Sequence, residues 1–517
     1  MKNYLAITTF FAGMTALAVE FGASRLLQMK FSAINLVWAV IIGLILVYFS
    51  LGYELGGRAA DRWPRPQTLF DLLTASGLSL LAVTLLSQPV LLAAARASDA
   101  LNLGIMGGAF LGTLLLFSLP VTLLAMVSPF ILRLSVEKTE TVGAQAGRLS
   151  AISTLGSVLG AFLPTLALFP LIGTYRSLLI FAALPLILAL GGGLILRHWP
   201  RILLNAVLAA LTIFLAINGQ FRGKDTARQI FETESEYNYI EVLQQPDGTR
   251  QLRLNDGQGV HSEYRADSLF YGGPWEQFLA GPFFNAAPHS PRQVERIAII
   301  GLAAGTTARQ ASAIFGAIPI DGYEIDPKIV QVGRDYFGMN LPNLNIFITD
   351  GRWGLEHSRQ QYSLIAVDAY RPPYIPPPLT TREFFQIAAE HLAPDGVLAI
   401  NIGRTPGDRR LINDLAATVA SVLPSVYVMD IPATFNSILY ATKQPTRAEN
   451  LSQNLALLQV DPATHPLLLQ VTQIARDNLQ ASPSGGQIYT DDLAPIEWVT
   501  NDMILRFLLG DELKTLQ

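Results

Sequence analysis

The stretch Arg296–Gly305 reads RIAIIGLAAG, an apolar, isoleucine-rich run that ends in small residues. β-Branched side chains favour strands, and small residues after a strand allow a tight turn. The next ten residues, TTARQASAIF (306–315), have the character of a helix. The stretch therefore predicts a strand, a turn and a helix, which is the first unit of an α/β domain.

Further strands are predicted downstream, and they alternate with helices. They are IPIDGYEID (Ile318–Asp326), NIFITD (Asn345–Asp350), SLIAVD (Ser363–Asp368) and VLAIN (Val397–Asn401), with helices at 327–337 and 381–392. This alternation indicates a parallel sheet, and such sheets bind ligands beyond the carboxyl ends of their strands, where the strand order reverses.

Residues suited to ligand binding end each of these strands. Gly301 and Gly305 are expected to let the backbone approach a ligand. Glu324 lies about 20 residues further on, where an acidic side chain binds ribose hydroxyls. Asp350 could accept a hydrogen bond from an adenine amino group, and Asp368 would lie beside the reactive group. Together they predict a nucleotide-binding α/β domain.

The N-terminal half has a different composition. Seven runs contain no Asp, Glu, Lys or Arg: 3–19, 34–53, 72–95, 105–132, 149–175, 177–196 and 202–221. A bilayer core needs about 20 apolar residues in helical form, because lipid offers no partner for open backbone groups. We predict a transmembrane bundle of about seven helices followed by a Rossmann-like α/β domain.

The composition changes near residues 218–228, after which no long apolar run returns. We expect a transmembrane domain at 1–221, a linker and small β-region at 222–290, and the Rossmann-like domain at 291–517. The alternation in 237–254, around the turn PDGT, predicts a β-hairpin in the middle segment.

Charge and composition exclude several kinds of site. The net charge of −4 argues against a large nucleic-acid surface. The chain has no cysteine, so thiolate metal sites and cysteine nucleophiles are excluded. The spacing of His261, His289 and His357 does not suggest a metal site, and we expect none.

Several motifs resemble those of one enzyme family. They are LNDGQG (Leu254–Gly259), EID (Glu324–Asp326), TDGR (Thr349–Arg352) and VDAYRPPYIPPPLTTREFF (Val367–Phe385). Over roughly residues 239–443 the chain resembles spermidine synthases, the aminopropyltransferase branch of the class I S-adenosylmethionine-dependent methyltransferase fold. Its transmembrane half makes it similar to the membrane-bound, transporter-fused bacterial subgroup.

The resemblance implies a role for each matching residue. The expected nucleoside-binding residues are Gly301, Gly305, Glu324, Asp350, Gly351 and Asp368. Asp368 is also the expected catalytic residue. The proline-rich loop would be the lid of the active site, and Tyr271, Tyr370, Arg371 and Tyr374 would contact the acceptor or belong to this lid.

Two positions depart from the family pattern. Ala304 replaces an acid that contacts the amino group of the donor, and Arg371 replaces the aspartate that acts as general base. A diamine is a dication near neutral pH because amine pKa values are about 10, so its binding site needs carboxylates. The acceptor could therefore be a small amine or an anionic molecule, since arginine suits carboxylate or phosphate.

Several functions remain open. The resemblance implies a membrane-anchored transferase that uses decarboxylated S-adenosylmethionine or S-adenosylmethionine as co-substrate. The alternatives are a methyltransferase on the same fold, a polyamine transporter or sensor with a catalytically silent nucleoside-binding domain, and chemistry on an anionic lipid. The expected partners are the lipid bilayer and the acceptor, without nucleic acid, and either domain could support a homo-oligomer.

The distribution of Lys and Arg residues does not decide the membrane topology. Seven spans place the termini on opposite faces, with nine Lys and Arg residues on the face of the N-terminus and seven on the face of the soluble domain. That difference is too small for the positive-inside rule to decide. We expect an inner-membrane protein with a cytoplasmic soluble domain, because the family's donor is made in the cytosol.

Overall fold

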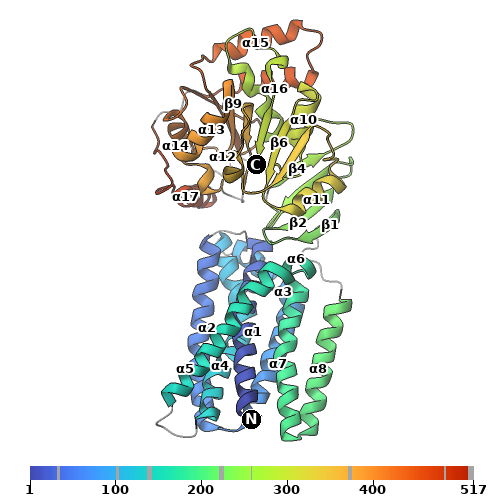
Figure 1. Ribbon diagram of the computed structural model, residues 1–517, viewed down its shortest axis with the longest axis vertical. Coiled ribbons are helices and arrows are strands. Elements are labelled where there is room, and N and C mark those ends of the chain that lie inside the picture. Colours follow the sequence, from blue (N-terminus) through green and yellow to red (C-terminus); the bar gives the residue numbers. More distant parts are fainter. Residues whose placement is uncertain are drawn as a thin grey trace. The chain divides into compact units, whose positions relative to one another are not determined.

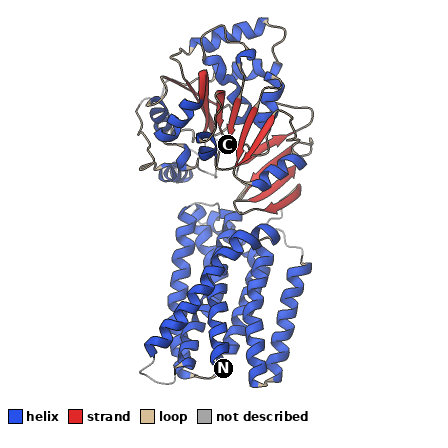
Figure 2. Ribbon diagram, in the orientation of Figure 1, coloured by secondary structure: helices blue, strands red, loops and turns tan. Residues whose placement is uncertain are grey.

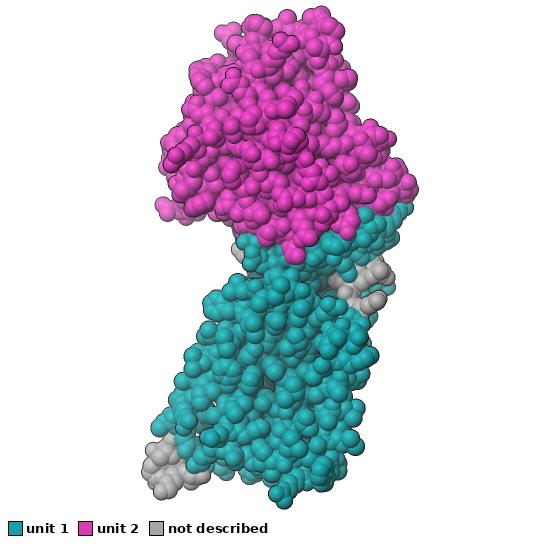
Figure 3. Space-filling model, turned by 45° about the vertical axis from the view of Figure 1, so that its right-hand side comes forward, with its two compact units in different colours: residues 1–241, 254–257 teal, residues 242–253, 258–517 magenta. Residues whose placement is uncertain are grey.

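The computed structural model describes residues 1–31, 35–100, 104–136, 142–219, 226–257, 259–370, 375–481 and 485–509. The chain divides into two compact units, residues 1–241 with 254–257 and residues 242–253 with 258–517 (Figure 3). The domain limits expected from the sequence, at residues 221 and 290, stay a prediction.

The first unit is dominated by helices. They are α1 (Lys2–Phe31), α2 (Asn35–Arg62), α3 (Pro66–Ala100), α4 (Gly104–Ser135), α5 (Val142–Leu163), α6 (Phe169–Ile172), α7 (Thr174–Leu196) and α8 (Trp199–Asn218), with η2 (Pro164–Leu168) joining α5 to α6 (Figures 1 and 2). In the described part of the chain, seven helices are long and apolar enough to cross a membrane. The prediction of about seven long apolar helices is therefore confirmed.

Small residues bring α1 and α5 close together. A Cβ at Gly156 would meet the carbonyl oxygen of Phe10, and one at Gly160 would meet that of Met14. Only glycine permits this approach of two backbones, and small residues play the same role in contacts between membrane helices.

A four-stranded sheet follows the helices. Its strands are β1 (Gln229–Glu234), β2 (Tyr239–Gln244), β3 (Arg250–Leu254) and β4 (Val260–Tyr264), in that order. The predicted hairpin at 237–254 is confirmed as β2 and β3. Short segments α9 (Pro274–Gln277), η3 (Phe278–Phe284) and η4 (Pro291–Gln293) then lead to the α/β domain.

The α/β domain is built on a seven-stranded sheet. Its strands are β5 (Ile297–Ile300), β6 (Ile320–Glu324), β7 (Leu344–Ile348), β8 (Tyr362–Val367), β9 (Leu392–Gly403), β10 (Ser425–Asp430) and β11 (Asn436–Thr442), in the order β10-β11-β9-β8-β5-β6-β7. The predicted strands are confirmed, and β7, β6, β5, β8 and β9 pair in parallel. The expected parallel sheet is nevertheless mixed, because β11 pairs antiparallel with both β9 and β10. The connection between β10 and β11 is too short for a parallel crossover, so these two strands form a hairpin.

Helices pack on both faces of this sheet (Figures 1 and 2). The helices of this domain are α10 (Thr306–Phe315), α11 (Pro327–Tyr336), α12 (Gly351–Glu356), α13 (Arg382–His391), α14 (Arg410–Ala420), α15 (Glu449–Val460), α16 (Pro466–Asp477) and α17 (Ile496–Leu509), with the short η5 (Pro377–Leu379) before α13. The residues of β5 alternate between two cores, with Ala298 and Ile300 in one and Ile297 and Ile299 in the other. Side chains of a strand point alternately to its two faces, so covering both faces requires an apolar residue at every position.

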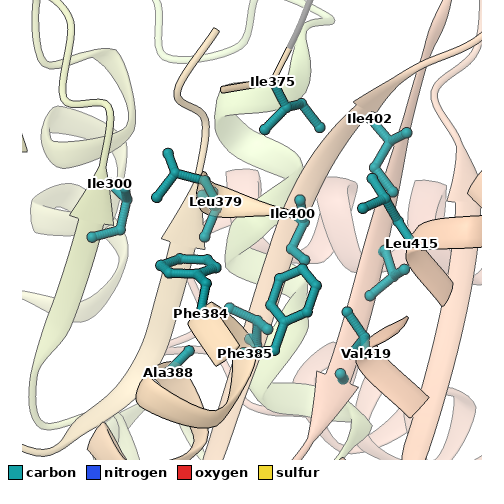
Figure 4. Close-up of a cluster of buried hydrophobic side chains, with 14 of the residues drawn as sticks. Ile300, Ile375, Leu379, Phe384, Phe385, Ala388, Ile400, Ile402, Leu415 and Val419 are labelled. Atoms are coloured by element: carbon teal, nitrogen blue, oxygen red, sulfur yellow. The ribbon is translucent and has the colours of Figure 1, made fainter. Parts of the chain in front are cut away.

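The core that contains Ile300 is drawn in Figure 4. There Phe384 and Phe385 of α13 and Leu415 of α14 pack toward Ile400 of β9. This packing fixes the carboxyl ends of β8 and β9. Chain order reverses at β5, with β6 on one side and β8 on the other, so the α/β rule places a ligand site at the carboxyl ends of β5 and β8.

Candidate active site

A cavity of about 470 Å³ lies at these strand ends in the second unit. Asp368, which directly follows β8, lines it together with Ala303 from the loop after β5. The backbone N–H of Asp368 donates to the carbonyl of Ile300 at 2.8 Å, so the position of Asp368 is tied to the end of β5. The cavity therefore occupies the switch point of the sheet.

A chain of two amides orients the carboxyl group of Asp368. Asn401 Nδ2 donates to Asp368 Oδ1 at 2.8 Å, and Asn436 Nδ2 donates to Asn401 Oδ1 at 3.0 Å. Both asparagines also line the cavity. Because β8, β9 and β11 are neighbours, three adjacent strands supply this network.

Burial changes the acidity of Asp368. Desolvation raises the pKa of this carboxyl to about 7, although the hydrogen bond from Asn401 acts in the opposite direction. A carboxyl group with a pKa near neutrality can pair with a cation when charged and can also accept a proton from a bound group.

Glu324 lies at the end of β6 and faces the loop after β5. Its carboxylate accepts from the backbone N–H of Ala303 at 2.9 Å and from that of Asp326 at 3.0 Å. Burial raises the pKa of Glu324 to about 7. Ala303 adopts a left-handed conformation with φ 48°, which is uncommon for a residue other than glycine and is found preferentially at functional sites.

Backbone conformation and packing within the protein require both glycines of the β5–α10 loop. Gly301 has φ +84°, and a Cβ there would lie 2.7 Å from Asp368 O and from the backbone of Ala369. Gly305 also has φ +84°, and its Cβ would lie 2.6 Å from Met339 Cγ. The expectation that these glycines admit a ligand stays a prediction, but packing is sufficient to explain both.

Asp350 directly precedes α12, and Gly351 is the first residue of this helix. Asp350 is exposed, and its Oδ1 accepts from the backbone N–H of Trp353 at 2.9 Å, so it caps the helix. A Cβ on Gly351 would lie 2.5 Å from Ile300 Cγ2. Neither residue lines the cavity, and their expected contact with adenine stays a prediction.

The residues that we expected to contact the acceptor or to form the lid do not all line the cavity. Tyr370 lines the cavity, and its hydroxyl bridges the backbone of β9 by accepting from Gly403 N at 2.6 Å and donating to Asn401 O at 3.3 Å. Tyr271 does not line the cavity; its hydroxyl donates to Ser268 O at 2.9 Å. Arg371 and Tyr374 lie outside the described residues.

Ala304, where the family has an acid, is buried, and its N–H donates to Ser262 Oγ at 2.9 Å. No carboxylate replaces that acid among the described residues that line the cavity, since Asp368 is the only acidic one.

Sequence reasoning missed several residues that line the cavity. Asn401 ends the predicted strand VLAIN just as Asp368 ends the predicted strand SLIAVD, so the same pattern could have identified it. His261 also faces the cavity, and its Nε2 atom is buried without a hydrogen-bond partner in the described part of the chain. Burial lowers the pKa of His261 to about 4, so the ring is neutral at pH 7.

Known proteins are similar in sequence to this region. The spermine/spermidine synthase domain family matches residues 285–453. The chain is 31% identical over 280 residues to a probable polyamine aminopropyl transferase of Bifidobacterium longum, over 52% of this chain and 61% of that protein. It is 32% identical over 241 residues to the polyamine aminopropyltransferase of Vibrio vulnificus, over 45% of this chain and 75% of that protein. The chain thus covers less than two-thirds of the Bifidobacterium protein.

Similar solved structures include a probable spermidine synthase from Corynebacterium glutamicum. That structure has a TM-score of 0.41 and 21% sequence identity, and the match covers 51% of this chain and 96% of that chain.

Proposed function

The chain belongs to the polyamine aminopropyltransferase family, and from that premise we propose that it is a membrane-anchored transferase. The donor is decarboxylated S-adenosylmethionine or S-adenosylmethionine, and the first of these supplies an aminopropyl group to an amine acceptor. The observation that carries the proposal is the position of Asp368 in the cavity at the switch point, oriented by Asn401.

The donor's nucleoside would lie at the ends of β5, β6 and β7. Glu324 supports this placement, because ribose hydroxyls are donors and its carboxylate already faces the loop after β5. Asp350 and Gly351 at the start of α12 are the proposed contacts for adenine. The sulfonium end would then lie toward Asp368.

The transfer is a displacement at the carbon beside the sulfonium. The amine nitrogen forms a bond to that carbon, the carbon–sulfur bond breaks, and its electron pair stays on sulfur, which leaves as the neutral thioether methylthioadenosine. The nitrogen must also lose a proton. We assign its acceptance to Asp368, because this carboxyl has a pKa of about 7 and Arg371 cannot take up a proton.

Product analysis tests the proposal. Full-length protein in detergent, given decarboxylated S-adenosylmethionine and an amine, should release methylthioadenosine. Asp368→Asn should lower the rate by about 10²–10⁴-fold, as expected for loss of a general base. Asp492→Asn is the matched control, because Asp492 is exposed and does not line the cavity. Equal rates for both variants would show that Asp368 takes no part in the chemistry.

A methyltransferase is the second candidate. The chain is 27% identical over 154 residues to an eEF1A lysine and N-terminal methyltransferase of Bos taurus, over 28% of this chain and 22% of that protein. Formation of S-adenosylhomocysteine from S-adenosylmethionine, without methylthioadenosine, would establish this alternative.

The bilayer is the proposed partner of the seven apolar helices, and we place the protein in the inner membrane with the soluble domain in the cytoplasm. The remaining alternative is a transporter or sensor. Calorimetry with both donors and with methylthioadenosine separates it from the enzymes, since a chain that binds none of them could not be a transferase of this family.

A further inference from the structure

We infer that the C-terminal helix α17 completes the acceptor pocket of this chain, and that the acceptor is a primary monoamine with an apolar body. This inference rests on the proposed transferase function. It concerns a helix outside the matched synthase domain, because that match ends at residue 453 and α17 spans Ile496–Leu509.

One face of α17 lines the cavity. Thr500, Met503, Ile504 and Phe507 all belong to its lining. They recur with the i, i+3, i+4, i+7 spacing of a single helical face. Three of the four are apolar, so α17 contributes an apolar wall.

Packing and an ion pair hold α17 in place. Met503 is only 3% exposed and belongs to the same core as Leu415 of α14. Asp502 Oδ2 pairs with Arg410 Nη1 of α14 at 2.7 Å. The ring of Phe507 meets that of Phe435, from the β10–β11 loop, edge to face at 5.8 Å between centroids. The helix is therefore docked on the domain as part of the site.

The charges around the cavity suit one ammonium group. Asp368 is the only carboxylate among the described lining residues, and Arg404 is the only cation in that set. His261 belongs to the same set but is neutral. Arg404 Nε lies 3.4 Å from Asp430 Oδ1, so its charge is partly compensated. The second ammonium of a diamine would still face Arg404 or the apolar wall without a partner, and an unpaired charge in such surroundings is costly.

Two unpartnered polar atoms fit the single polar end of a monoamine. Thr500 is 6% exposed, and its Oγ1, like His261 Nε2, is buried without a hydrogen-bond partner within the described residues. An ammonium has three N–H donors. Asp368, His261 and Thr500 provide acceptors for them, while Trp275, Phe435 and the α17 face can cover an alkyl or aryl body.

Amine binding tests the inference independently of turnover. The full-length protein is titrated by calorimetry with 2-phenylethylamine and with 1,4-diaminobutane, each with and without methylthioadenosine. We expect the monoamine to bind at least about 10-fold more tightly, which corresponds to about 1.4 kcal/mol. Equal affinity, or tighter binding of the diamine, would overturn the inference.

A charge added to α17 tests the role of this helix. Phe507→Glu places a second carboxylate on the cavity face, and we expect it to shift the affinity ratio toward the diamine by about 10-fold or more. Trp498→Glu adds the same charge at a position of α17 that is 66% exposed and outside the lining, and it should leave the ratio unchanged. Unchanged methylthioadenosine binding shows that each variant is folded.

The two proposals fail in different ways. A protein that prefers the monoamine but binds no nucleoside and releases no methylthioadenosine refutes the transferase and keeps the pocket assignment. A protein that makes methylthioadenosine best with 1,4-diaminobutane keeps the transferase and refutes the monoamine. A folded Phe507→Glu variant with an unchanged ratio refutes the contribution of α17. If Phe507→Glu does not fold, the comparison of the two amines on the unchanged chain decides.

Discussion

At the scale of single residues, the proposed chemistry depends on how Asp368 is held. Its carboxyl is buried at the end of β8, and one of its two oxygens receives the amide of Asn401. Desolvation favours the protonated form, whereas the hydrogen bond favours the charged form. The balance leaves the pKa of Asp368 near 7, where a small change in surroundings changes its charge at physiological pH.

Removing the amide should therefore move the pH dependence. In Asn401→Ala the charged form of Asp368 loses its donor, so its pKa rises and the acid limb of kcat/KM moves to higher pH. The raised pKa of Asp368 also makes the stability of the folded protein depend on pH. The folded-state pKa of Asp368 lies above its unfolded value of 3.8, so its contribution to stability is greatest below pH 3.8 and is lost as the pH rises through about 7.

The profile of methylthioadenosine release against pH checks this. Asn436→Ala is the graded control, because Asn436 reaches Asp368 only through Asn401, and its acid limb should move less in the same direction. An acid limb that stays in place in Asn401→Ala would show that Asp368 is not the group that titrates.

At the scale of elements, the β5–α10 loop sets the distance between β5 and β8. We expect Gly301→Ala to destabilise the folded protein strongly. The left-handed conformation costs about 1–3 kcal/mol for a residue with a side chain, and the new Cβ would also clash with Ala369. Gly316→Ala is the matched control, since Gly316 has φ +79° but nothing within 4 Å of its Cβ.

Chemical denaturation of both variants measures the difference. The Gly316 variant should show the conformational cost alone, and the Gly301 variant should show a larger loss together with weaker nucleoside binding. Equal losses would mean that the contact between the ends of β5 and β8 relaxes without cost.

The start of α12 offers a second test, because Asp350 caps a helix and is also the proposed adenine contact. Asp350→Ala should cost about 1 kcal/mol of stability through loss of the cap, and it should weaken nucleoside binding more than Asp368→Ala does. Asp350→Ser keeps a capping oxygen and removes the carboxylate. Calorimetric titration with methylthioadenosine distinguishes the roles: if Ser restores full affinity, the carboxylate does not recognise adenine.

At the scale of the whole molecule, the proposed cytoplasmic position of the α/β domain can be tested by labelling. The chain has no cysteine, so single cysteines can be labelled without background. We expect Ser452→Cys, at an exposed position of α15, to react with a membrane-impermeant maleimide only after spheroplasts are permeabilised.

Arg65→Cys is the matched control for topology. Arg65 lies between α2 and α3 and is exposed, and with seven spans this connection lies on the face opposite the soluble domain. It should react in intact spheroplasts. The reverse pattern would place the soluble domain outside, where a cytosolic donor could not reach it.

The sequence by itself determined the seven apolar helices, the alternation of strands and helices, and the acids at the ends of β6 and β8. These features follow from the composition and periodicity of residues that are close together in the sequence. The hairpin of β10 and β11 was missed for the same reason, because it departs from the alternation that surrounds it.

Only the tertiary structure decided what faces the cavity. The amide of Asn401 reaches Asp368 across 33 residues of sequence, and α17 returns from the C-terminal end to line the site with Thr500 and Met503. His261 arrives from β4, more than 100 residues before Asp368 in the sequence. Such contacts depend on strand order and on which face of a helix packs inward, and neither is encoded in the spacing of adjacent residues.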